Sequence, residues 1–180
     1  MKYGIVWFGC LFSFHIGLCQ KDTSTSVNNY QQLLSSAMVR GHFIYETPLS
    51  KPVAPSISYD YFKDYACNKD GVADSARYRQ FVDSAVYSEL VKNSMVTNNR
   101  PWTRKELNGF VLVKTSEQAG NHVIFRYARP VFDRKKEYAL IQYTCGTHLD
   151  DKHGCSGRGM IILHRENGVW KELRGVVTLR

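Results

Sequence analysis

Six side chains that could do chemistry together lie in one short loop. They are Cys145, His148, Asp150, Asp151, His153 and Cys155. Thiolates and neutral imidazoles are the ligands of tetrahedral zinc, so the two cysteines and two histidines form one candidate zinc site, with the aspartates orienting the imidazoles. A reduced cysteine with a histidine base would instead make a thiolate nucleophile. The third interpretation is a disulfide between the two cysteines.

The start of the chain decides between these interpretations. Lys2 precedes an apolar run over residues 5–18, which is typical of a secretory signal and too short for a comfortable membrane span. Gly17 and Cys19 are small enough for a cleavage site, so residues 1–19 are predicted to be a signal peptide. Acylation of Cys19 in a lipoprotein and a retained membrane anchor are the alternatives.

An exported protein would be periplasmic or secreted, where paired cysteines oxidise more often than they bind metal. We therefore predict a disulfide between Cys145 and Cys155, no cofactor, and Cys67 left as a free, buried thiol. The polar residues enclosed by this disulfide make a predicted binding loop. They are His148, Asp150, Asp151 and His153.

The composition points to a basic protein of ordinary size. The chain has 180 residues and a formal net charge of +8, which favours anionic envelope polymers or lipid headgroups as partners. Nucleic acid is not expected for an exported protein. The expected partner is an envelope polymer or protein, and the mature chain is expected to lack a membrane span.

Residues 20–56 are predicted to lie ahead of the main domain. They comprise a flexible polar leader over residues 21–29, a short helix over Tyr30–Val39 and an extended segment. The extended segment contains the prolines Pro48, Pro52 and Pro55, which oppose helix formation. Residues 57–180 are predicted to form a single α+β domain with a hydrophobic core.

The strongest helical pattern runs from Ala73 to Met95, where apolar residues recur at three- and four-residue spacing. Asp74 is the expected N-cap of this helix. Just upstream lies an aromatic cluster that could stack on sugar rings, although packing in the core is the preferred interpretation. Its tyrosines are Tyr59, Tyr61 and Tyr65.

From Gly109 onward the pattern changes to strands rich in β-branched and aromatic residues. The predicted strands are Phe110–Lys114, His122–Phe132, Tyr138–Thr147, Gly159–Arg165 and Val169–Leu179. Hairpin turns are expected at Asp133–Lys136 and Glu166–Gly168. Helices followed by such a meander predict an α+β fold, with N-terminal helices packed on a C-terminal antiparallel sheet. A fold of the nuclear-transport-factor type, with a cone-shaped pocket, is one form of this arrangement.

The C-terminal third resembles a family of exported bacterial proteins of the Bacteroidetes type that have no assigned activity. The resemblance covers about residues 129–173. It rests on Arg129-Pro-Val-Phe-Asp, Glu137-Tyr-Ala-Leu-Ile, Cys145-Gly, Gly154-Cys-Ser-Gly157, Ile161-Ile-Leu and Gly168-Val-Trp-Lys. It implies export, this order of strands and paired cysteines. The stretch between the cysteines is longer and more polar than the family pattern.

The sequence thus predicts a noncatalytic, exported binding or interaction module of the cell envelope. One alternative is a small envelope enzyme or metal-dependent protein that uses the loop between Cys145 and Cys155. Another is an immunity or inhibitor protein whose loop plugs a partner. The fold alone does not separate these classes, because one fold can serve many functions.

Overall fold

The computed structural model describes most of the chain in seven segments. They are residues 23–38, 42–52, 54–69, 72–73, 82–96, 98–146 and 157–179. The predicted signal peptide and the predicted binding loop lie outside these residues. Signal cleavage and acylation of Cys19 therefore remain predictions.

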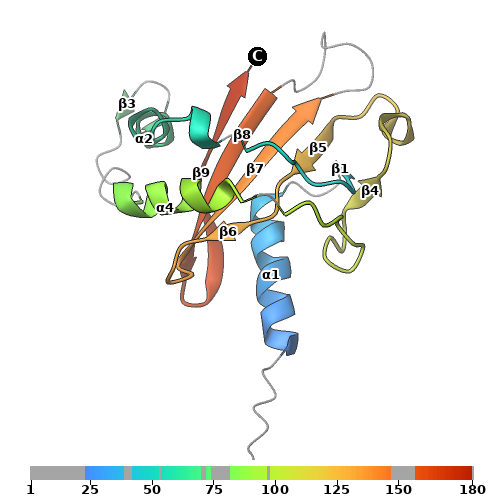
Figure 1. Cartoon of the computed structure of the whole chain (residues 1–180), viewed down its shortest axis with the longest axis horizontal. Coiled ribbons are helices and arrows are strands. Elements are labelled where there is room, and N and C mark those ends of the chain that lie inside the picture. Colours follow the sequence, from blue (N-terminus) through green and yellow to red (C-terminus); the bar gives the residue numbers. More distant parts are fainter. Residues whose placement is uncertain are drawn as a thin grey trace, which may run out of the picture.

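A seven-stranded sheet forms the centre of the molecule, with the order β4-β1-β5-β7-β8-β9 and with β6 paired to β7 (Figure 1). Its strands are β1 (Phe43–Tyr45), β4 (Val111–Val113), β5 (Ile124–Tyr127), β6 (Val131–Phe132), β7 (Tyr138–Gly146), β8 (Gly157–Glu166) and β9 (Val169–Leu179). A separate small sheet pairs β2 (Asn68–Lys69) with β3 (Val72–Ala73). The fold is mixed α and β, as predicted.

The sheet is mixed, which corrects the prediction of a purely antiparallel meander. Strands β7, β8 and β9 do form an antiparallel meander. Strand β1, however, lies between β4 and β5 and pairs with both in parallel. A strand of three residues carries too little alternation to stand out in the sequence, and its partners lie far along the chain.

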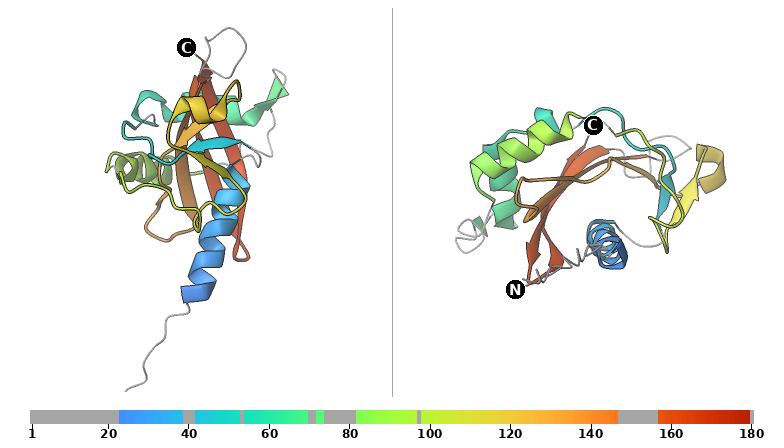
Figure 2. Two further views of the ribbon diagram at one scale, coloured as in Figure 1. Left: turned by 90° about the vertical axis from the view of Figure 1, so that its right-hand side faces the viewer. Right: turned by 60° about the horizontal axis from the view of Figure 1, so that its bottom comes forward.

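Helices lie on both faces of the sheet. Helix α1 (Thr23–Ala37) lies on the concave face, and α2 (Tyr59–Cys67) and α4 (Ser84–Ser94) lie on the other (Figure 2). Strand β7 alternates between two core clusters: Ile141 packs with residues of α1, whereas Leu140 packs with residues of α2 and α4. Ala139, Ile141, Tyr143 and Cys145 share the face of β7 that packs with α1.

Helix α1 begins at Thr23 and ends at Ala37, so the predicted leader over 21–29 and the predicted helix over Tyr30–Val39 are both misplaced. The buried side chains of Leu33 and Leu34 anchor its C-terminal half. Once such a half is fixed, each further residue adds a hydrogen bond without a new nucleation cost. The first turns, which are rich in serine, threonine and asparagine, can therefore be helical without an apolar stripe.

Helix α1 also reaches the edge of the sheet through a side-chain amide. Gln32 donates to the Trp170 carbonyl at 2.8 Å and accepts from the Trp170 N–H at 2.8 Å. The Ser36 hydroxyl donates to the same carbonyl at 3.0 Å. The amide therefore bonds to the edge of β9 as a neighbouring strand would.

Helix α4 begins later than the sequence pattern suggested. Its N-cap is Asp83, whose carboxylate accepts from the Ala85 N–H at 2.7 Å. Ala73, the predicted first residue of the helix, belongs instead to β3. Residues 74–81 lie outside the described residues, so the proposed cap at Asp74 remains a prediction.

The predicted strand over His122–Phe132 is split into β5 and β6, which is a further correction. Residues Ala128–Pro130 separate the two strands, and proline cannot donate to a strand ladder. The two predicted turns are confirmed, with positive φ at Lys136 in the first and at Asn167 and Gly168 in the second.

Candidate functional site

The predicted binding loop lies outside the described residues, and Cys145 is the described residue that leads into it. Cys145 lies at the end of β7, where it is 9 % exposed and disulfide-bonded. The side chain of its partner is not among those described, and His148, Asp150, Asp151, His153 and Cys155 all lie outside the described residues. The pairing of Cys145 with Cys155, the alternative zinc site and the binding loop therefore stay predictions.

The tyrosines of the aromatic cluster all lie on α2, and the two whose side chains are described have different surroundings. Tyr59 is half-buried: its hydroxyl donates to the Val82 carbonyl at 3.0 Å and its ring meets Tyr87 edge-on. Tyr61 is 50 % exposed. The side chain of Tyr65 lies outside those described, as does that of Cys67. This arrangement favours packing rather than a sugar-stacking platform for Tyr59.

The described histidines all stack on neighbouring aromatic rings. His42 stacks on Phe125 and His122 stacks on Phe43. His164 stacks on Tyr138 with ring centroids 4.6 Å apart. Within the described ranges, no three His, Cys, Asp or Glu side chains gather in an arrangement that could hold a metal ion.

The most elaborate polar arrangement in the described part of the chain is centred on Arg129, at the break between β5 and β6. Its side chain is only 7 % exposed, and its guanidinium lies over the Trp102 ring at 4.4 Å. The Nε–H donates to the Arg100 carbonyl at 3.0 Å, and one Nη donates to the Pro101 carbonyl at 2.9 Å. These bonds fix the guanidinium in one orientation.

Glu106 is the carboxylate partner of two arginines. Arg129 donates to both of its oxygens, at 2.8 and 3.3 Å, and Arg100 donates to Oε1. The Thr103 N–H and hydroxyl both donate to Oε2. Burial alone would raise the pKa of Glu106, but the bonds from Arg129 and Thr103 outweigh it and lower the pKa to about 2. Glu106 is therefore ionised at neutral pH and acts as a fixed counter-ion.

The local sequence explains why this carboxylate sits here. Thr103 and Glu106 are three residues apart and form a reciprocal pair, since the Glu106 N–H also bonds back to the Thr103 hydroxyl at 3.3 Å. Trp102 anchors the segment, because its N–H donates to the Glu46 carbonyl and its indole to the Tyr127 carbonyl. Gln31 ties α1 to the same segment by donating to the Lys105 carbonyl at 2.8 Å.

An open cavity of about 560 Å³ lies against this arrangement, and we call it the Arg129 cavity. It is lined by Tyr30, Gln31, Asn98, Arg100, Thr103, Lys105, Glu106, Arg129 and Pro130. Burial is the largest effect on the phenol of Tyr30 and raises its pKa, although Arg129 opposes this. Tyr30 therefore presents a neutral hydroxyl to the cavity at physiological pH.

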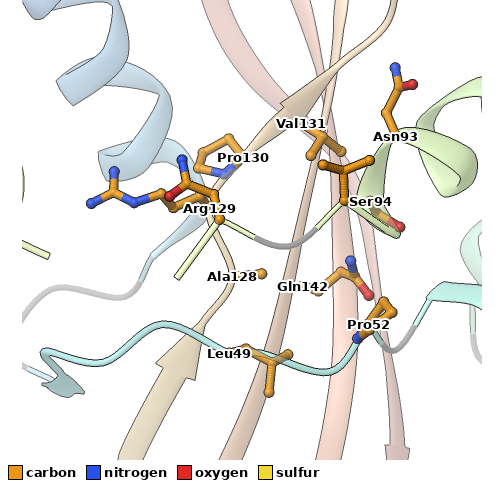
Figure 3. A pocket seen from close by; sticks show the side chains of 11 residues that line it. Leu49, Pro52, Asn93, Ser94, Ala128, Arg129, Pro130, Val131 and Gln142 are labelled. Atoms are coloured by element: carbon orange, nitrogen blue, oxygen red, sulfur yellow. The ribbon is translucent and has the colours of Figure 1, made fainter. Parts of the chain in front are cut away.

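A smaller cavity of about 260 Å³ adjoins the first one and shares Asn98, Arg129 and Pro130 with it. Figure 3 shows that the Arg129 guanidinium points toward α1, away from Gln142 and Pro52 in this second cavity. Gln142 is buried, and its carbonyl oxygen Oε1 accepts from the Ala54 N–H at 2.6 Å. The second cavity thus lacks the exposed cations of the first.

The charges around the Arg129 cavity favour an anionic ligand. Glu106 is committed to Arg129 and Arg100, yet the Arg100 side chain is 62 % exposed and keeps further N–H groups for a ligand. Lys105 has no carboxylate partner among the residues that the structure describes. Both cations lie on the rim beside the neutral Tyr30 hydroxyl.

We did not predict this site from the sequence. The spacing of Thr103 and Glu106 was a readable signal for a capped turn. Nothing local, however, connects that turn with Arg129 or with Tyr30, which come from other parts of the chain. The Arg129-Pro130 pair belongs to the family resemblance, and the pattern around it predicts a continuous strand.

Comparison with known proteins gives no match for this chain among protein-family models, curated proteins or solved structures. Within the described ranges, none of the helices combines the length and the apolar character that crossing a membrane requires.

Proposed function

We propose that this chain is an exported, noncatalytic binding protein of the cell envelope, and that its Arg129 cavity binds the anionic groups of an envelope polymer. The observation that carries the proposal is the pair of rim cations, Arg100 and Lys105, beside a cavity of about 560 Å³. The net charge of +8 supports the same class of partner.

The rigidity of the cavity wall supports binding. Arg129 and Glu106 hold one another through several hydrogen bonds, and Trp102 packs beneath the guanidinium. A wall that is ordered before the ligand arrives loses little conformational entropy on binding. Arg100 is held near the rim by Glu106, so the ligand meets a positioned cation rather than a free one.

The cavity lies where α1 meets the segment before β4, between a helix and a curved sheet. This arrangement is compatible with the cone-shaped pocket of a nuclear-transport-factor-like fold, which we retain as a proposal for the fold family. We also retain the disulfide-closed loop as a second contact region. The polymer would then contact the protein at two places, which raises the effective affinity.

Equilibrium binding to a carboxylated polysaccharide tests this function. We expect the protein to bind polygalacturonate and to leave dextran, an uncharged polysaccharide, unbound. The double variant Arg100→Ala/Lys105→Ala is expected to weaken polygalacturonate binding by about tenfold or more, since it removes two charge-assisted contacts. Binding should also weaken as salt is raised, because exposed charges are screened.

A matched double variant distinguishes binding at the Arg129 cavity from non-specific electrostatic binding of the polymer to a basic protein. Arg134→Ala/Lys135→Ala removes the same charge from an exposed hairpin between β6 and β7. We expect this control to bind almost as well as the parent protein. Equal loss in both variants, or equal binding of dextran, would contradict the proposed site.

Export is tested separately by the intact mass of the protein recovered from its native envelope. A mature chain that begins at Gln20 would support signal cleavage, and an acylated Cys19 would support a lipid anchor. Recovery of the whole chain with Met1 in the cytoplasm would contradict export.

A further inference from the structure

A second arginine lies on the convex face of the sheet and lacks a polar partner. The Nε of Arg126 is buried and has no hydrogen-bond acceptor. Its guanidinium stacks over the Tyr45 ring at 4.3 Å from the centroid, so its orientation is held by an aromatic face rather than by a carboxylate. Within the described residues, Arg126 belongs to no ion pair.

Strand pairing places a hydroxyl next to this arginine. Arg126 on β5 lies directly opposite Thr144 on β7, and Ile124 lies opposite Gly146. Residues that are directly opposite in an antiparallel pair project to the same face with side chains in reach of one another. These four residues, with Tyr45 and Cys145, line a cavity of about 250 Å³.

The cavity has the chemistry of a small anion site. An arginine presents two N–H groups along one edge, which match the two oxygens of a carboxylate or a phosphate. The Arg126 side chain donates no hydrogen bond to a described residue, so its guanidinium keeps donors for an oxyanion in the cavity. The Thr144 hydroxyl can donate to the same anion, and the cavity lining contains no carboxylate that would repel it.

We propose that Arg126 and Thr144 form a binding site for a small oxyanionic group, distinct from the Arg129 cavity. Arg126 would donate through its guanidinium edge, and Thr144 would donate through its hydroxyl. Tyr45 holds the guanidinium in place and keeps the arginine from turning away. The two cavities share no lining residue. An experiment can therefore contradict one proposed site without contradicting the other.

The direct test follows the Nε–H resonance of Arg126 in nitrogen-15 spectra of the full-length protein. Sodium acetate and inorganic phosphate are titrated separately, with sodium chloride at equal ionic strength as the control. We expect the Arg126 resonance to shift in a saturable way with acetate, with phosphate or with both. Tighter binding of acetate identifies a carboxylate as the natural group, and tighter binding of phosphate identifies a phosphoryl group.

Two variants keep the result interpretable. Thr144→Val preserves the shape of the side chain. It is expected to weaken oxyanion binding by about fivefold, because the hydroxyl donor is lost. Arg134→Gln, on the exposed hairpin, removes an arginine elsewhere and should leave the affinity unchanged. The proposal is overturned if the Arg126 resonance responds to chloride as it does to the oxyanions, or if Thr144→Val binds them as tightly as the parent.

Discussion

Glu106 shows how one carboxylate can organise several parts of the chain. It neutralises the buried Arg129 and the exposed Arg100, and it receives two hydrogen bonds from Thr103. Replacing it with glutamine would leave Arg129 buried beside a neutral group. The cost of an uncompensated buried charge, rather than the loss of attraction, then dominates the change in stability.

We expect Glu106→Gln to lower the free energy of unfolding by about 2–3 kcal/mol in urea titrations, below the range for fully buried pairs because Arg100 is exposed. The matched control is Glu172→Gln, which removes an exposed carboxylate from β9 and should change stability by less than about 0.5 kcal/mol. Equal effects of the two substitutions would show that Glu106 is not a special counter-ion.

The low pKa of Glu106 also predicts a pH dependence. Because the folded-state pKa is about 2 and the ordinary value is 4.5, the folded state favours the ionised carboxylate. This stabilisation is complete above pH 4.5 and is lost as the pH falls from 4.5 toward 2. Urea midpoints measured across this range should fall more steeply for the parent protein than for Glu106→Gln. If the urea midpoints of the two proteins fell equally with pH, the low pKa of Glu106 would be contradicted.

At the scale of elements, the Gln32 amide makes two of the polar contacts between α1 and the edge of the sheet. Gln32→Leu would leave the Trp170 N–H without its partner. We expect the free energy of unfolding, measured by urea titration, to fall by about 1–3 kcal/mol. Gln31→Leu is the control on the same helix, because Gln31 makes one exposed bond to the Lys105 carbonyl. Gln31→Leu should lower the free energy of unfolding clearly less than Gln32→Leu does. A larger loss in Gln31→Leu would contradict the role of Gln32 at the edge of β9.

The hairpin between β8 and β9 gives a second element-scale prediction. Gly168 has φ of 82°, and a Cβ added there would meet no atom within 4 Å. Gly168→Ala should therefore cost about 1 kcal/mol through backbone strain alone, without a steric clash. Equilibrium unfolding measures this cost. An unchanged stability would mean that the turn adjusts to another conformation.

The same hairpin shows what the sequence could predict. The pair Asn167-Gly168 and the alternating residues on either side are local signals, and β9 was predicted with its observed bounds. Strand β1 was missed because Phe43–Tyr45 owes its place to partners in β4 and β5 rather than to its own pattern. The Arg129 cavity was missed for the same reason, since Tyr30, Glu106 and Arg129 meet only in the folded chain.

At the scale of the whole molecule, the predicted disulfide acts mainly on the unfolded state. Closing the loop between Cys145 and Cys155 would restrict the unfolded chain and stabilise the fold by about 2–3 kcal/mol. Cys145→Ser should lower the melting temperature under oxidising conditions. Under reducing conditions the parent and the variant should melt closer together. Unchanged melting of Cys145→Ser in the absence of reductant would exclude the predicted disulfide as a stabilising link.

The contact between Gln32 and Trp170 joins the first described helix to the last described strand. Leu33 and Leu34 of α1 likewise share a core cluster with Leu163 and Trp170, near the end of the chain. Helix α1 therefore cannot complete its packing until the ribosome has made β9. A chain still being synthesised would keep α1 without its final partner until that strand has been made.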